Sequence, residues 1–435
     1  MLVFVVNPFE TFFPNLGGLT VGRIVGLLTM LVWLIYLARN KKAWARATSS
    51  RLLYNQIPFH LAAFLGALVW FSKPEGINAL SGAITFLILG ILALMVESII
   101  DDVKKLRIVA TGMAIAGVLA CIPAFMYIFG FDLYTLLGAE PPSDLNEETE
   151  RASSIGGSPN ALGIIARNGI FASILVITIS KKRWVSLLMW GFIFVCFSSI
   201  ILAGSRTNFY GSIIVFLVIG YFAASDFFKN PTRIITALVL VLAIGIYGFQ
   251  FAPESIKQRL LFGADDDRIA ERANSRVDFT KYQQDQAWEF VGKYPLVGVG
   301  IDRTYIESGW VAGAHDTLSV ILGEMGFLGI LSFLWLMAWA AWSIWKMLRI
   351  RRNNLNKVQL ALLLGTLLSM LVMGYAGGFI IPYDRAFWMT LGLMMPLAKW
   401  LNFQNSKTTS KAKVKNQIPS DFIPINQLTT NESHR

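Results

Sequence analysis

Charged side chains are scarce in this chain. Asp, Glu, Lys and Arg make up 15% of its 435 residues, and 55% of the residues are hydrophobic. Soluble globular domains carry roughly 25% charged residues, so the composition excludes a chain of ordinary soluble domains. Apolar runs close to the roughly 20 residues that cross a bilayer recur from end to end. One membrane domain is therefore the expected organisation.

Cysteine is rare in the chain, and the usual sequence motifs for binding metals and nucleotides are absent. The only two cysteines, Cys121 and Cys196, lie inside apolar runs, where we expect them to pack as small side chains. The sequence contains no HExxH, CxxC or GxxxxGK motif and no internal repeat. We therefore expect no metal and no cofactor, and metalloprotease chemistry and ATP-driven transport lose their usual sequence support.

The predicted fold is an all-α integral membrane protein with about 11 or 12 transmembrane helices and a long, partly helical extracytoplasmic loop. Each span must be helical, because lipid offers the backbone no hydrogen-bond partner. The clear spans cover residues 22–38, 52–71, 77–96, 108–129, 161–179, 185–202, 209–224, 234–251, 316–342, 358–379 and 386–401. Residues 1–16 are apolar but short and broken by Pro8, so they form either a partial twelfth span or an interfacial segment.

Lys and Arg gather in every second loop, which marks those loops as cytoplasmic. The basic loops lie near residues 39–51, 104–107, 181–183 and 346–357. The alternate loops are 130–159, which is rich in Asp and Glu, and 252–314, and both are expected to face the periplasm or the cell exterior. Residues 1–402 form the membrane domain, and residues 403–435 form a polar cytoplasmic tail that we expect to be disordered. The basic loops and the tail then face anionic lipid headgroups, which explains much of the net charge of +11 without a nucleic-acid partner.

The loop 252–314 is the longest connection in the chain, and connections of this length usually carry function unless they are disordered. It contains aromatic residues at helical spacing, at positions 279, 282, 288 and 290, followed by a turn region over residues 294–300. We predict one or two amphipathic helices here, forming a lid over an extracytoplasmic cavity.

Arginine is well suited to bidentate contact with phosphate oxygens, and several arginines lie in or beside this loop. They are Arg259, Arg268, Arg272, Arg276 and Arg303. The alternative is a surface helix whose arginines pair with the acidic residues at positions 265–267, 271 and 278. For any single arginine, that structural explanation is the simpler one.

Further ionisable residues lie beside or within the spans and are functional candidates for that reason. Arg206 occupies a very short outward turn, where its side chain can bind an anion or simply extend to the headgroups. His315 begins the span after the lid and is either a catalytic base or an ordinary helix-start residue. Arg167 and Arg385 are further candidates, and Arg167 could instead pair with Glu324 to hold the bundle together.

Several segments together resemble the O-antigen ligase and polymerase superfamily. Residues 315–329, H-D-T-L-S-V-I-L-G-E-M-G-F-L-G, resemble its C-terminal signature, roughly H-N-x-(Y/L)-L followed by (A/G)-E-x-G-(L/I)-x-G. Upstream, Arg276, Trp288 and residues 294–300 are similar to an R, W, P-(L/I)-x-G-x-G run. Arg206 is similar to the arginine of a short S-R turn, residues 158–162 resemble a P-N-x-x-A segment, and Arg385 precedes an aromatic final span. Asp316 stands where the family most often has Asn, which bears on the acceptor contacts around His315.

The resemblance implies a glycosyltransferase in the bacterial plasma membrane with its active site facing outward. Its donor would be a glycan linked to polyprenyl (undecaprenyl) diphosphate, and its acceptor a sugar hydroxyl of a glycan or lipid core. Single displacement from diphosphate, a good leaving group, predicts an inverting reaction without a metal. We assign Arg206 and Arg276 to the diphosphate and His315 to the proton of the acceptor hydroxyl. The predicted substrate-binding residues are Arg167, Arg272, Arg303, Arg385, Asn160 and Asp316.

Other functions remain open at this point. A polymerase of O-antigen or exopolysaccharide and a ligase that passes glycan to a lipopolysaccharide core fit the sequence alike, and either could work with other polysaccharide-assembly proteins. A multi-span transporter of a small anion or of a lipid-linked glycan is the alternative class. Transporters place polar groups near the midplane, whereas this chain concentrates them at its outer surface.

Overall fold

A computed structural model gives the arrangement of most of the membrane domain. It describes residues 21–73, 76–127, 129–136, 159–180, 182–227, 281–301, 303, 316–350, 354–375, 380–394 and 396–397. Most of these residues are helical, and no strand occurs among them. The predicted class, an all-α integral membrane protein, is confirmed.

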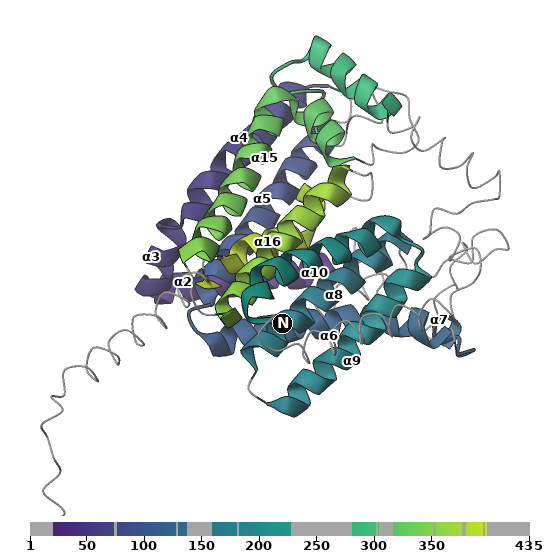
Figure 1. Cartoon of the computed structure of the whole chain (residues 1–435). Coiled ribbons are helices and arrows are strands. Elements are labelled where there is room, and N and C mark those ends of the chain that lie inside the picture. Colours follow the sequence, from purple (N-terminus) through teal and green to yellow (C-terminus); the bar gives the residue numbers. More distant parts are fainter. Residues whose placement is uncertain are drawn as a thin grey trace, which may run out of the picture.

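Helices α2 to α6, α8 to α10 and α15 to α16 follow one another with short connections (Figure 1). The first half contains α2 (Val21–Arg39), α3 (Lys41–Thr48), α4 (Arg51–Trp70), α5 (Gly76–Ile99), α6 (Val103–Tyr127) and α7 (Leu133–Leu136). The second half contains α8 (Pro159–Ile179), α9 (Arg183–Leu202), α10 (Arg206–Phe227), α15 (Thr317–Ile350), α16 (Asn354–Tyr375) and η3 (Ile381–Tyr383). Two further helices cover residues 281–293 and 385–394.

Among the described residues, seven helices are long and apolar enough to cross a membrane, or up to eight if the bent pair α2–α3 counts as one span. Described helices overlap each predicted span except 234–251, which lies outside the described residues. Residues 1–16, the tail 403–435 and most of the loops 130–159 and 252–314 also lie outside them. The total of about 11 or 12 spans therefore stays a prediction.

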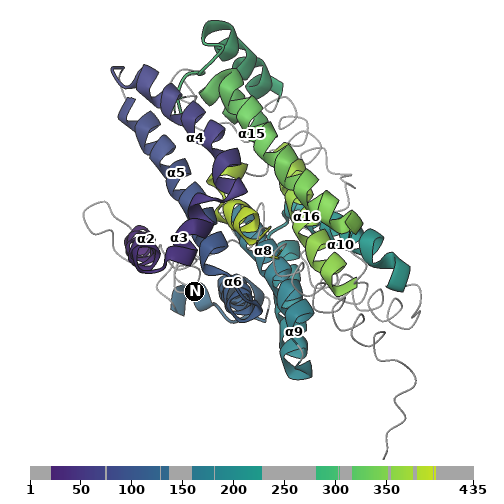
Figure 2. The same cartoon turned by 90° about the vertical axis from the view of Figure 1, so that its left-hand side faces the viewer.

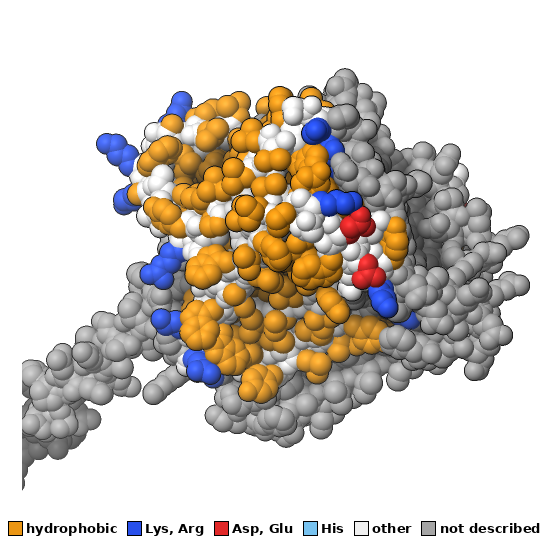
Figure 3. All heavy atoms as spheres, turned by 90° about the horizontal axis from the view of Figure 1, so that it is seen from above, with side chains coloured by type: hydrophobic (Ala, Val, Ile, Leu, Met, Phe, Trp, Pro, Cys, Tyr) orange, Lys and Arg blue, Asp and Glu red, His pale blue; other side chains and the backbone are white. Residues whose placement is uncertain are grey.

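The helices pack in two groups that share α16. Helix α4 packs against α5 and α15, while α6, α8 and α9 pack together and α10 lies along α16 (Figure 2). Cys121 and Cys196 are both free and buried, as expected for packing residues. Large apolar side chains remain exposed on the outer faces, and Figure 3 shows them over most of the described part of one face. A broad apolar surface of this kind suits contact with lipid.

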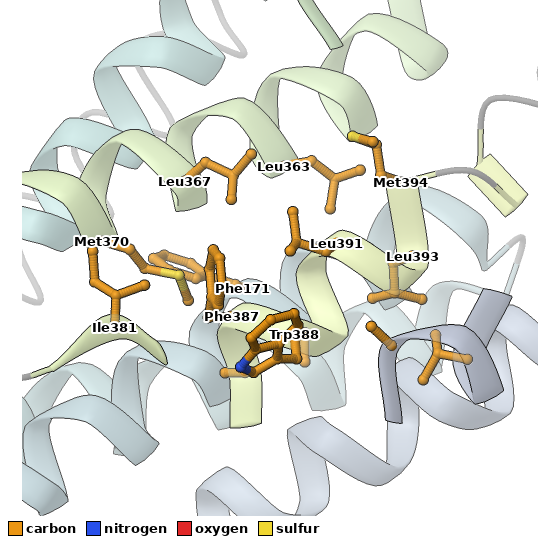
Figure 4. Packing of buried hydrophobic residues seen from close by; sticks show 14 of the residues in the cluster. Phe171, Leu363, Leu367, Met370, Ile381, Phe387, Trp388, Leu391, Leu393 and Met394 are labelled. Atoms are coloured by element: carbon orange, nitrogen blue, oxygen red, sulfur yellow. The ribbon is translucent and has the colours of Figure 1, made fainter. Parts of the chain in front are cut away.

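The helix 385–394 lies at the centre of the bundle. Its Phe387, Trp388 and Leu391 are fully buried in the core shown in Figure 4, where the Trp388 ring packs on Phe59 and His60 of α4 and the Phe387 ring on Phe333 of α15. The indole Nε1 of Trp388 donates a hydrogen bond to the carbonyl oxygen of Pro382 at 2.8 Å, which satisfies its polar atom inside the core. The start of the helix 385–394 is therefore held firmly against η3.

Candidate functional site

The start of α10 is held against the start of α8 by buried amides and a hydroxyl. The Nδ2 of Asn208 donates to the Oγ of Ser205 at 2.9 Å and to the backbone oxygen of Asn160 at 3.4 Å. Ser205 in turn donates to the Oδ1 of Asn160 at 3.3 Å. Asn208 is fully buried, so these bonds hold the turn 203–205 in one place. Arg206, the first residue of α10, is thereby fixed at this end of the bundle, where it is half-buried.

Arg167 lies on the same face of α8 as Asn160, seven residues farther along the helix. Its side chain is fully buried and forms an ion pair with Asp384, with Nη2 and Oδ2 3.7 Å apart. The same Nη2 donates to the Oδ1 of Asn168 at 3.2 Å, and Nη1 contacts the sulfur of Met373 on α16. Arg167 thus joins α8 to α16 and to the segment before the last helix. The partner Asp384 is an acidic residue beside a predicted span, a signal that could have identified it from the sequence.

Asp384 also caps the helix 385–394. Its Oδ1 accepts a hydrogen bond from the backbone N–H of Ala386 at 2.8 Å. Burial raises the pKa of the Asp384 carboxyl, although the charge of Arg167, the bond from Ala386 and the charge of Arg385 oppose that shift. Arg385 follows directly and is half-buried at the first turn of this helix.

Asp316 has the same structural task at the start of α15. Its Oδ1 accepts from the backbone N–H groups of Leu318 at 3.0 Å and of Ser319 at 3.2 Å. The hydroxyl of Thr317 accepts a bond from the backbone N–H of Ile381 at 3.0 Å, which ties the start of α15 to η3. Asp and Asn are comparably good N-cap residues, so the aspartate at this position preserves the helix start that an asparagine would give.

Arg303 lies in a different environment, against the last residue of α4. Its Nε donates to the backbone oxygen of Val299 at 3.0 Å, and its guanidinium carbon lies 4.8 Å from the centre of the Trp70 ring. The side chain is almost fully buried. Within the described residues, these contacts give Arg303 a role in holding the chain segment 294–300.

A small, mostly apolar cavity of about 30 Å³ lies between α6, α8, α16 and the helix 385–394. Its lining includes Met113, Phe171, Leu363 and Leu393, together with the polar side chains of Asn168, Thr366 and Thr390. Because Asn168 accepts a bond from Arg167, the cavity adjoins the Arg167–Asp384 pair.

Comparison with known families is decisive for the region from the middle of α9 to the middle of α15. Residues 191–334 match a family described as O-Antigen ligase. The match confirms the predicted family. No curated protein gives a match to the chain.

The O-antigen ligase region contains part of the predicted site, and the rest comes from elsewhere in the chain. Arg206, Arg303 and Asp316 lie within it, whereas Asn160, Arg167 and Arg385 lie outside it. The structure brings Asn160 to the turn before Arg206, and Arg167 to the residue before Arg385. His315, Arg272 and Arg276 fall within the matched residues but outside the described ones, so their roles stay predictions. Within the described part of the chain, no group of His, Cys, Asp and Glu residues could hold a metal ion.

Proposed function

We propose that this O-antigen ligase-type membrane glycosyltransferase transfers a glycan from a polyprenyl diphosphate donor to a sugar hydroxyl on the outer face of the bacterial plasma membrane. The observation that carries the proposal is the O-antigen ligase match over residues 191–334, together with arginines at the starts of two helices. Arg206 starts α10, Arg385 starts the last helix, and Arg167 pairs with Asp384 beside it. Fixed arginines of this kind stabilise the charge that develops on a departing diphosphate.

Besides these arginines, the reaction needs a group that accepts the proton of the acceptor hydroxyl. The oxygen of the acceptor hydroxyl bonds to the anomeric carbon of the donor as the bond from that carbon to the diphosphate oxygen breaks. We assign the hydroxyl proton to His315, whose ordinary pKa of about 6.5 suits a base near neutral pH. Polyprenyl diphosphate leaves with the electron pair of the broken bond. Displacement from the opposite face would invert the anomeric configuration and would need no metal.

The remaining candidates act around this centre. We assign Arg206 and Arg276 to the diphosphate and place Arg167, Arg272, Arg385, Asn160 and Asp316 as supporting groups of the substrate site. Polymerase and ligase activities differ only in the acceptor, and we favour a polymerase because no feature of the chain identifies a lipid-core acceptor.

The first experiment measures the glycans attached to polyprenyl diphosphate in cells that lack this protein. Mass spectrometry of the extracted lipids should show single repeat units for a polymerase and long lipid-linked chains for a ligase. Arg206→Ala and His315→Ala should reproduce the accumulation. Arg183→Ala is the control, since that side chain is exposed at the start of α9, beside a loop predicted to be cytoplasmic. An unchanged lipid profile in the deletion strain would contradict the proposal and favour transport.

A further inference from the structure

The segment 294–300 inserts into the hydrogen-bond ladder of α15. In an uninterrupted helix, the N–H groups of residues 327 and 328 would donate to the carbonyls of residues 323 and 324. Here Phe327 and Leu328 donate instead to Pro295 at 2.8 Å and Leu296 at 3.2 Å. The carbonyls of Gly323 and Glu324 accept from Val299 and Gly300, each at 2.9 Å. The segment therefore splits α15 and pairs the four backbone groups that residues 323, 324, 327 and 328 would otherwise share within the helix.

Two glycines make this insertion possible. Gly326 adopts φ 61° and ψ −158° inside α15, a conformation open essentially only to glycine. A Cβ at Gly326 would lie 2.6 Å from the carbonyl carbon of Leu296, and a Cβ at Gly298 would lie 2.5 Å from that of Glu324. The backbones of the two segments are thus in direct contact, and neither position has room for a side chain.

Trp70, the last residue of α4, holds the opposite side of the inserted segment. Its indole Nε1 donates to the backbone oxygen of Gly298 at 3.0 Å, and its ring meets Tyr294 edge-on with centroids 4.7 Å apart. The guanidinium carbon of Arg303 lies 4.8 Å from the centre of the same Trp70 ring, and its Nε donates to the backbone oxygen of Val299 at 3.0 Å. Trp70 and Arg303 therefore hold two successive carbonyls of the segment whose N–H groups bind α15.

We propose that Trp70 and Arg303 are positioning residues for glycan transfer, acting through the segment 294–300 on the first part of α15. This inference rests on the proposed function. Trp70 and Arg303 form a clamp on the segment 294–300, and through that segment the clamp fixes the orientation of the short helix 317–325. This helix carries Glu324 and directly follows His315 and Asp316 in the sequence. A displacement of about 1 Å in a reacting group can cost about a hundredfold in rate. Because Trp70 lies outside residues 191–334, the N-terminal half of the chain contributes to the geometry of the O-antigen ligase region.

The test measures separately whether the segment 294–300 stays bound to α15 and how fast glycan is transferred. Leu296 and Leu328 are both exposed, and the backbone N–H of Leu328 donates a hydrogen bond to the backbone oxygen of Leu296. A Leu296→Cys/Leu328→Cys pair should therefore form a disulfide cross-link quickly. Both native cysteines are buried and serve as an internal background. Trp70→Ala should slow cross-linking and lower turnover, whereas Trp70→Phe keeps the ring and should lower turnover only about threefold to tenfold, the effect of one hydrogen bond. The KM for the donor should stay unchanged in both.

Rescue distinguishes positioning from a general loss of stability. Once the cross-link has formed in the Trp70→Ala protein, transfer should return towards the unsubstituted rate. Trp44→Ala, at an exposed tryptophan of α3, should change neither cross-linking nor transfer. Cross-linking that ignores Trp70→Ala, or cross-linked protein that stays inactive while the unsubstituted protein transfers glycan, would overturn the inference. Absence of transfer in the unsubstituted protein, with cross-linking still dependent on Trp70, would reject the proposed function and support the clamp.

Discussion

At the scale of single residues, the polar side chains near the candidate site are mostly engaged with helix ends. Asp316 and Asp384 each bind backbone N–H groups at the start of a helix, and Asn160 accepts bonds at the start of α10. These contacts fix three helix starts, so that Arg206, Arg385 and the residue that follows His315 have defined positions. A rigid frame of this kind lets a few arginines act on a substrate without reorganising.

Arg167→Met should destabilise the protein by about 3–5 kcal/mol, because it leaves the carboxylate of Asp384 buried without its cation. Thermal or denaturant unfolding in detergent measures the change. Asp384→Asn, combined with Arg167→Met, should recover part of the loss, since the asparagine retains the helix cap and removes the charge.

Arg183→Met is the matched control for this pair, because Arg183 is exposed at the start of α9. Its stability should differ from the unsubstituted protein by less than about 0.5 kcal/mol. Equal stabilities of Arg167→Met and the unsubstituted protein would show that the buried pair contributes nothing.

At the scale of elements, α15 is the helix whose form departs from the simple expectation. Its apolar run predicts one continuous span over residues 316–342, and the structure instead joins two helices at Gly326. The position of the element was predicted and its internal break was not. A glycine inside an apolar helix is a weak signal, because the break is stable only when another segment satisfies the freed backbone groups.

Gly326→Ala should lower stability by about 1–3 kcal/mol from backbone strain alone. It should also displace the segment 294–300, since the new methyl group would meet the backbone of Leu296. Faster proteolysis within that segment and a lower unfolding temperature are the measurements.

Gly191→Ala provides the comparison, because nothing lies within 4 Å of a Cβ at that helical position. It should be neutral or stabilise α9 slightly, as alanine is the better helix former by about 1 kcal/mol. A Gly326→Ala protein as stable as Gly191→Ala would contradict the account of the break.

At the scale of the whole molecule, the basic loops predict the direction of insertion, and that direction determines which side the site faces. Leu136 on α7 and Trp184 at the start of α9 are both exposed and lie at ends of the spans that are predicted to face opposite sides. In spheroplasts, a membrane-impermeant thiol reagent should label Leu136→Cys, and Trp184→Cys only after permeabilisation.

The unsubstituted protein should remain unlabelled in both conditions, because Cys121 and Cys196 are buried. The reverse pattern of labelling would place Arg206, Arg385 and the start of α15 in the cytoplasm. That result would remove the outward-facing site from the proposed function.

The sequence by itself determined the fold class, the position of nearly every described span and the family, because hydrophobic run length and motif spacing are local properties. It also singled out Arg206 and Asn160, which lie at neighbouring helix starts, and Arg385 and Arg167, which both lie beside Asp384. Only the tertiary structure decided that Arg167 pairs with Asp384 and that Trp70 binds Gly298, 228 residues away. Membrane helices are apolar on both their lipid and protein faces, so their sequences say little about which helices become neighbours. Contacts between distant residues follow from that packing and from the backbone groups that each break in a helix leaves to be satisfied.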